Sequence, residues 1–238
     1  MGGNYFLSKA LKLFMRLWLV YIIVIPIGYI VAPGKYPSSL MELVLNISNI
    51  ETSYNVSEWF LLPYLLMVFV SRPVLRFVFK NRFIVSFLTS IVIYVAYLLV
   101  YTTIGLDKID LYTGPLGRKV FLTMGFVFPF VLGVLAFKYH LPERVGHIFS
   151  KVGSLGKRFA IIVLLSIIAV RCVIHNQTLQ PFAVFCFFIL FPSLKVSHFT
   201  MKILCFLGKH SIVIWFIHTW FSVNLFSGQI YGLYYPIA

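Results

Sequence analysis

Long apolar runs, separated by short polar or basic segments, make up most of this chain. A helix needs about 20 mostly apolar residues to cross a bilayer. Phe83–Ile104 and Val120–Phe137 meet this need and contain no charged residue. Leu13–Ala32 and Val56–Phe79 carry charges only toward their ends, and we expect a kink at Pro26 in the first of them. These four runs predict transmembrane helices.

Three further apolar runs are shorter or less continuous. Phe159–Ile174 and Leu179–Leu194 are short, and a polar turn, HNQT, joins them. The last run begins near Ile203, and no charged residue follows Lys209. The pattern therefore predicts an all-α bundle of seven transmembrane helices, forming a single domain over residues 1–238.

The composition also favours a membrane protein. Of the 238 residues, 61% are hydrophobic and only 11% are charged, whereas soluble domains carry about 25% charged residues. The formal net charge of +14 would suit a nucleic-acid partner. The basic residues, however, lie in short clusters between the apolar runs. We therefore predict contact with a lipid bilayer and no binding of nucleic acid.

The charges of the loops orient the predicted helices. Cytoplasmic loops are enriched in Lys and Arg. If the N-terminus is cytoplasmic, 15 of the 20 basic residues lie on that side, and the other five are Lys35, Lys108, Arg118, Lys119 and Arg171. Five of the six acidic residues lie on the outer side. A wrong helix count would scramble this asymmetry, so it supports both the orientation and the count of seven.

Cysteines and sequons add little to this picture. Three cysteines lie in or beside apolar runs without CxxC spacing, and we expect buried thiols with no disulfide and no metal site: Cys172, Cys186 and Cys205. Three N-x-S/T sequons fall on the predicted outer side, where they matter only in a eukaryotic secretory pathway: Asn46, Asn55 and Asn176.

His218 is the most informative ionisable residue, because it lies within the last apolar run, beyond Lys209. Placing an ionisable group inside a bilayer costs free energy, and such groups often have a function. Ser211, Trp215, His218 and Ser222 share one helical face, which we expect to point into the bundle. One interpretation places His218 in a pocket, where it contacts a polar substrate or transfers a proton. The other is a structural histidine bonded to a neighbouring helix.

Glu58 and Trp59 lie at the predicted outer edge of the Val56–Phe79 run. Glu58 is a candidate to line an outward-facing cavity, and Trp59 either joins it or anchors the helix at the membrane interface. The sequence contains no HExxH motif, paired intramembrane carboxylates or nucleophile elbow. Composition and spacing alone therefore leave the activity open.

Three stretches resemble one known family. The residues from Leu207 to Thr219, LGKHSIVIWFIHT, closely resemble a signature near the end of the membrane acyltransferase-3 family. Glu58–Tyr64, followed by Arg72–Leu75, is similar to a Trp-Phe helix of that family, and Pro129–Val134 is similar to its Pro-Phe helix. The three stretches occur in the family's order.

The resemblance implies a multi-pass enzyme of the bacterial cytoplasmic (inner) membrane. Such enzymes transfer an acyl group, commonly acetyl, from cytoplasmic acyl-CoA to a hydroxyl of a cell-envelope sugar. The resemblance therefore implies acetyl-CoA as co-substrate, a sugar acceptor as partner, and no bound cofactor or metal. The candidates for a substrate pocket are His218, Ser211, Trp215, Glu58 and Trp59.

The N-terminal region resembles the family only in part. The family's catalytic histidine lies in its first helix, and a basic R-x-x-R motif precedes its third helix. Phe6–Lys12 is similar to that approach, with Lys9 and Lys12 in place of arginines and Arg16 nearby. No histidine precedes His140. We therefore expect a fragment that lacks the first helices and the last one, and we assign no catalytic residue.

Two other classes of function stay open at this point. A small-molecule or glycolipid transporter or flippase would need a polar path across the membrane, usually with broken helices and intramembrane acids. A non-catalytic remnant or helper would only pack against a partner.

Overall fold

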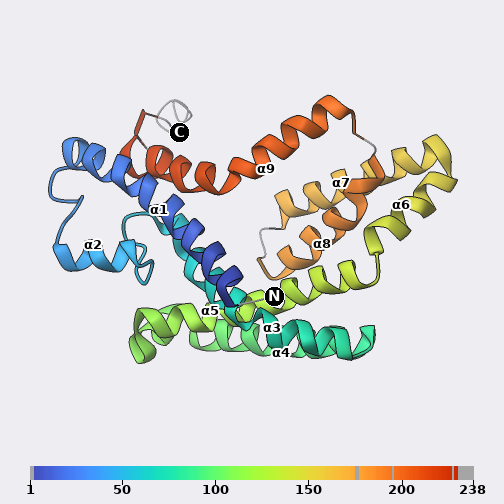
Figure 1. Cartoon of the computed structure of the whole chain (residues 1–238), viewed down its shortest axis with the longest axis horizontal. Helices are drawn as coiled ribbons and strands as arrows, with labels where there is room; N and C mark the ends of the chain where they lie inside the picture. Colours follow the sequence, from blue (N-terminus) through green and yellow to red (C-terminus); the bar gives the residue numbers. More distant parts are fainter. Residues whose placement is uncertain (1–2, 175–176, 195, 227, 230–238) are drawn as a thin grey trace. The chain divides into compact units, whose positions relative to one another are not determined.

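The structure, a computed structural model, describes residues 3–174, 177–194, 196–226 and 228–229 (Figure 1). These residues form nine α-helices and no strand, so the predicted all-α class is confirmed. The α-helices are α1 (Gly3–Val31), α2 (Leu40–Ile47), α3 (Leu61–Lys80), α4 (Phe83–Ile104), α5 (Leu106–Lys138), α6 (Leu141–Lys151), α7 (Gly153–Val173), α8 (Gln180–Leu190) and α9 (His198–Thr219). Short helical turns adjoin them: η1 (Val56–Phe60), η2 (Gln177–Leu179), η3 (Phe191–Leu194) and the π-helical η4 (Trp220–Leu225).

Among the described residues, five helical segments are long and apolar enough to cross a membrane. They are Ala10–Val31, Ser57–Lys80, Phe83–Ile104, Leu106–Lys138 and His198–Ser222. Most of their apolar surface is exposed, and only 17% of the apolar window of α4 is buried within the protein. Water would solvate such a surface poorly. The chain is therefore a multi-pass membrane protein. Within it, α1 is assigned as one helix that contains Pro26.

The helices α7 and α8 differ from the predicted fifth and sixth spans. The charge-free part of α7, between Arg158 and Arg171, is about 20 Å long at 1.5 Å per residue. The helix α8 has 11 residues and is about 16 Å long. Both are shorter than the hydrocarbon core, which is about 30 Å thick. The sequence pattern identified two real helices here, but by length and composition only five of the seven predicted spans qualify among the described residues.

The helix α5 begins earlier than the predicted span Val120–Phe137 and is interrupted. Gly114 has φ 69° and ψ 177°, a backbone conformation that residues with a side chain rarely adopt. Pro115 follows and suits the first turn of a new helix, where its missing N–H costs no hydrogen bond. The membrane-length part of α5 therefore starts at Pro115.

The helices gather into two compact units. Unit 1 contains Met1–Phe69, Thr113–Lys119 and Phe199–Ala238, and unit 2 contains Val70–Tyr112 and Val120–His198. The sequence prediction of a single domain over residues 1–238 stays a prediction.

The core of unit 1 forms around one face of α1. Leu17, Val20 and Val24 recur at helical spacing and are buried, together with Tyr36 and Trp220. Figure 1 shows the end of α9, in red, beside the second half of α1, in blue. The aromatic ring of Tyr36 packs so closely on Gly28 of α1 that a Cβ there would lie 2.9 Å from it. The glycine therefore lets the segment after α1 fold back onto the helix.

Unit 2 packs parts of α3, α4 and α5 through apolar residues. Val78 of α3 shares a buried cluster with Val131 and Leu135 of α5. The end of α3 is also tied to α5 by polar contacts. Lys138 Nζ donates to the backbone carbonyl groups of Val78 at 2.9 Å, Phe79 at 3.3 Å and Asn81 at 2.7 Å. A cation at this position satisfies carbonyl groups that have no partner within a helix end.

Candidate functional site

Buried asparagines fold the segment between α2 and α3 in unit 1. Asn46 Nδ2 donates to the carbonyl of Glu42 and to the hydroxyl of Ser53, each at 2.9 Å. Asn55 begins η1, where its Oδ1 accepts a hydrogen bond from the amide of Ser57 at 3.2 Å. Asn46 and Asn55 are both buried. Their side chains are thus structural in the folded protein, and the sequon residue Asn176 lies outside the described residues.

Glu58 follows in η1, and three donors, two of them from distant parts of the chain, converge on its carboxylate. Its Oε2 accepts a hydrogen bond from the hydroxyl of Tyr21 at 2.6 Å. Its Oε1 accepts from Asn55 Nδ2 at 3.1 Å and from Trp220 Nε1 at 3.4 Å. Glu58 is 0% exposed, so protein donors replace the water that would otherwise solvate it. Donors alone surround both oxygens, which suits an ionised carboxylate.

Lys119 supplies a positive charge to the same region. Its side chain is 0% exposed, and its Nζ donates to the carbonyl of Trp59 at 3.2 Å. The charge of Lys119 acts on Glu58. The neighbouring Arg118 lies 3.9 Å from Glu51, which also joins the Thr113–Lys119 segment to this side of unit 1. Burying a carboxylate near a buried ammonium group costs far less free energy than burying either charge alone.

An aromatic cluster encloses the carboxylate. Trp220 contacts the rings of Tyr21, Tyr36 and Tyr54, with ring centroids 5.9, 5.1 and 6.4 Å apart. Tyr36 and Tyr54 also meet each other at 5.4 Å. These tilted and edge-on contacts are the arrangements that aromatic pairs prefer. The cluster keeps water from Glu58 and fixes the side chains that donate to it.

Two hydrogen bonds join η1 to α9. Trp215 Nε1 donates to the carbonyl of Ser57 at 2.9 Å, and Asn55 Nδ2 donates to the carbonyl of Phe216 at 3.0 Å. The ring of Phe60 packs against Trp215, with ring centroids 5.9 Å apart. The two stretches that carry most of the family resemblance therefore contact each other, although about 150 residues separate them.

The face of α9 that contains His218 is turned away from the core, contrary to the prediction. Ser211, Trp215 and His218 are exposed, whereas Phe216 and Trp220 are buried. The last two rings remove more apolar surface from solvent than the mixed face could, so they take the inner side of the helix. Trp215 satisfies its indole N–H at the edge of η1 and leaves 47% of its side chain exposed.

His218 bonds to its own helix rather than to a neighbouring one. Its Nδ1 lies 3.1 Å from the carbonyl oxygen of Ile214. Since a carbonyl can only accept, a hydrogen bond there places the proton on Nδ1 and leaves Nε2 as an acceptor. The ring contacts that of Trp215 at 5.4 Å. An exposed imidazole whose Nε2 can accept a hydrogen bond in the neutral ring therefore stands beside an exposed indole.

The remaining predicted residues whose side chains the structure describes are exposed, unlike Glu58. Trp59 is 41% exposed, as a membrane-interface anchor would be. Ser211 bonds its hydroxyl to the carbonyl of Gly208 in its own helix. Lys12 and Arg16 are exposed on α1, and the side chain of Lys9 lies outside the described part of the structure.

The cysteines are exposed, so the predicted buried thiols were wrong. All three lie on short or lipid-exposed helices, where apolar surroundings would be lipid rather than protein: Cys172, Cys186 and Cys205. Within the described residues no group of three or more His, Cys, Asp or Glu residues could hold a metal ion.

Sequence reasoning missed most of the groups around Glu58. Tyr21 lies in an apolar run like many other tyrosines, and Trp220 follows the recognised motif. Lys119 had the appearance of an ordinary loop charge. Asn55 offered the one local signal, because an Asn three residues before an acidic residue is a common start of a helical turn. Only the fold brings these side chains together.

Comparison with known proteins finds no matching family model, no similar curated protein and no similar solved structure.

Proposed function

We propose that this protein is a membrane acyltransferase of the acyltransferase-3 type, transferring an acetyl group from acetyl-CoA to a hydroxyl of a cell-envelope sugar. In this proposal the acceptor binds at the exposed edge of unit 1, beside Trp59, Trp215 and His218. The protein then lies in the bacterial cytoplasmic membrane with its N-terminus inside.

One observation carries the proposal. The stretches Glu58–Tyr64 and Leu207–Thr219 resemble the family independently, and in the fold Phe60 of one packs against Trp215 of the other, with ring centroids 5.9 Å apart. Glu58 does not touch the exposed edge itself. Instead it holds Asn55 and Trp220, which fix η1 against α9. We assign Glu58 the part of a positioning residue.

The exposed edge suits a sugar hydroxyl. The half-exposed indoles of Trp59 and Trp215 offer flat surfaces for the C–H face of a sugar ring. Nε2 of His218 then accepts the proton as the hydroxyl oxygen attacks the thioester carbonyl. The carbon–sulfur bond breaks, the acetyl ester forms, and the CoA thiolate takes up a proton.

Purified full-length protein in liposomes provides the test. The liposomes receive acetyl-CoA with a radiolabelled acetyl group and cell-surface polysaccharide as acceptor. We expect acetyl transfer that falls about 100-fold or more in His218→Ala, the usual contribution of a general base. His210→Ala is the matched control, because His210 is another exposed histidine of α9. Liposomes that bind acetyl-CoA no better than empty ones, and transfer no label, would refute the proposal.

Transport is the second candidate, and the interruption of α5 at Gly114 is the feature that favours it. Broken helices often form substrate sites in transporters. Such sites lie near the bilayer midplane, whereas charged residues flank Gly114 on both sides: Asp107, Lys108, Asp110, Arg118 and Lys119. This pattern places the break near the membrane surface. Uptake of a glycolipid by the same liposomes, abolished by Gly114→Ala and without acetyl transfer, would favour transport over catalysis.

A further inference from the structure

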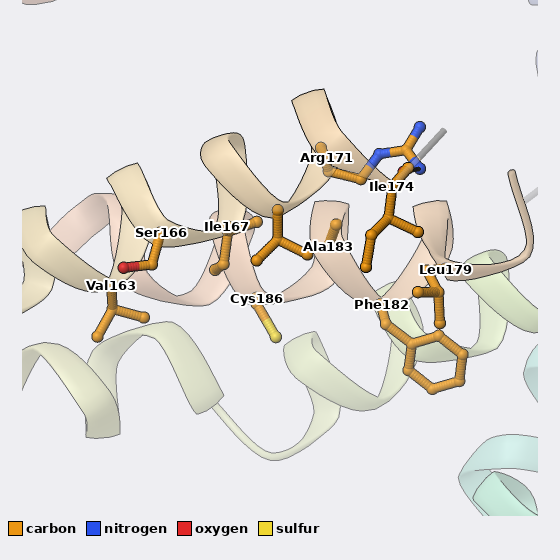
Figure 2. A pocket seen from close by; sticks show the side chains of 10 residues that line it. Val163, Ser166, Ile167, Arg171, Ile174, Leu179, Phe182, Ala183 and Cys186 are labelled. Carbon is orange, nitrogen blue, oxygen red and sulfur yellow. Dashed lines mark hydrogen bonds between the residues drawn. The ribbon is translucent and has the colours of Figure 1, made fainter. Parts of the chain in front are cut away.

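An apolar groove with one cation runs between α7 and α8 of unit 2 (Figure 2). Its volume is about 380 Å³, within the range of small-molecule sites. From α7 it is lined by residues that include Val163 and Ile167, and Ile174, which directly follows α7, continues this lining. From α8 come Ala183 and Cys186, whose small side chains leave the space open.

The length of the groove matches one leaflet of a bilayer. Val163 and Ile174 mark the extent of the α7 lining and are about 16 Å apart along the helix. Half of the hydrocarbon core is about 15 Å thick. Exposed apolar side chains flank the groove, among them Leu165 and Val184. A lipid acyl chain therefore fits both the length and the polarity of this surface.

Arg171 supplies the polar contact at one end. Figure 2 shows its guanidinium beside Ile174, at the end of α7. It donates a hydrogen bond to the carbonyl of Ile174 at 3.2 Å, which holds the cation at this end of the groove. Planar guanidinium groups bind phosphate oxygens in pairs.

The short apolar length of α7 makes an anionic partner favourable. Arg158 and Arg171 are about 20 Å apart along the helix, less than the roughly 30 Å of hydrocarbon. At least one of these charges is thus drawn toward the membrane interior unless the bilayer thins or the side chain extends. A lipid phosphate that accompanies Arg171 removes much of this cost.

We propose that the groove binds an anionic phospholipid of the surrounding bilayer, with one acyl chain between α7 and α8 and the phosphate at Arg171. A second apolar groove in unit 2, of about 440 Å³, provides a comparison. It is lined by apolar residues of α3 and α5, including Phe79 and Phe130, and by no charged residue. It should accept acyl chains without preferring anionic lipids.

The test uses full-length protein in nanodiscs that contain phosphatidylglycerol or phosphatidylcholine with a photoreactive diazirine in the acyl chain. Peptide mass spectrometry then locates the label. We expect labelling of α7 and α8 to be about fivefold higher with phosphatidylglycerol, the preference that one Arg near a phosphate supplies. Labelling of the α3–α5 groove should not differ between the two lipids.

Two variants separate the groove from the charge. Ala183→Leu fills the groove and should abolish labelling of α7 and α8 by both lipids. Val184→Leu is its matched control, because Val184 is exposed on α8 and does not line the groove. Arg171→Gln keeps the groove and should remove only the preference for phosphatidylglycerol.

Three results would overturn the proposal. One is unchanged labelling in Ala183→Leu, and another is equal labelling of the native protein by the two lipids. The third is displacement of the label by free oleate as efficiently as by phosphatidylglycerol, which would make the ligand a fatty acid. None of these measurements depends on acetyl transfer, so the groove and the proposed enzyme activity fail or succeed separately.

Discussion

The hydroxyl of Tyr21 in α1 donates a 2.6 Å hydrogen bond to the carboxylate of Glu58, 37 residues further along the chain. Both side chains are buried, and Trp220 of η4 contacts each of them. One polar contact in the core thus connects the first helix, the η1 turn and the end of the last helix.

Removing the Tyr21 hydroxyl should destabilise unit 1. Tyr21→Phe keeps the ring against Trp220 but leaves Oε2 of Glu58 without this donor. A hydrogen bond to a charged group contributes about 2 kcal/mol, and we expect a loss of that size in thermal unfolding in detergent. Tyr29→Phe, at an exposed position of the same helix, should leave the unfolding temperature unchanged. Equal effects of the two variants would contradict the structure.

Glu58 and Lys119 should be coupled energetically. Removing one partner of a buried charge pair costs about 3 kcal/mol or more, because the other charge is left without compensation. Glu58→Gln and Lys119→Met should each be destabilised by such an amount, while the double variant should lose less than the sum. Unfolding of all four proteins in detergent measures this coupling. Strictly additive losses would mean that the two charges do not interact.

Alanine should be poorly tolerated at Gly28. Its Cβ would meet the ring of Tyr36 at 2.9 Å, and Tyr36 is enclosed by Tyr54 and Trp220. We expect Gly28→Ala to lower stability by about 1–3 kcal/mol, the usual cost of overpacking. Gly208→Ala in α9 is the control, since a Cβ there meets nothing within 4 Å. It should be neutral or stabilised by about 0.5–1 kcal/mol, the helix preference of Ala over Gly.

Lys138 should hold the end of α3 in place. Lys138→Met loses the hydrogen bonds to three carbonyl groups at that end, so amide hydrogen exchange should become faster in the last turn of α3. Lys151→Met removes an equivalent charge from an exposed site and should have no such effect. Unchanged exchange in Lys138→Met would show that apolar packing alone fixes this helix end.

Loop labelling can test the proposed orientation. The three native cysteines are exposed and must first be replaced. In that background, Lys108→Cys should react with a membrane-impermeant maleimide in intact cells. Arg82→Cys should react only after the membrane is permeabilised, because the loop before α4 is predicted to be cytoplasmic. Labelling of both positions in intact cells would contradict the predicted topology.

The apolar runs were predictable because lipid imposes a length and a polarity on each helix. The core of unit 1 was harder to predict from sequence. A tyrosine in an apolar run gives no sign that its hydroxyl will meet Glu58, and a loop lysine gives no sign that it will be buried. These facts depend on contacts between distant parts of the chain.

The orientation of α9 is a second feature that the sequence alone could not predict. Helical spacing correctly grouped Trp215 with His218, whose rings contact each other. It could not tell which side of the helix would be covered, since both sides contain a large aromatic residue. Contacts with η1 determine which side of α9 is covered. The edge of η1 accepts a hydrogen bond from Trp215, and Phe60 of η1 packs beside Phe216.

The brevity of α7 and α8 also bears on how the last helix enters the bilayer. Only six residues separate Val173, the last of α7, from Gln180, the first of α8, and two helices with so short a connection return the chain to the leaflet from which it departed. The direction of α9 is therefore the same whether these two helices reach the far leaflet or stay within the near one. During biosynthesis, shallow or deep insertion of this pair would leave the exposed edge around His218 facing the same compartment.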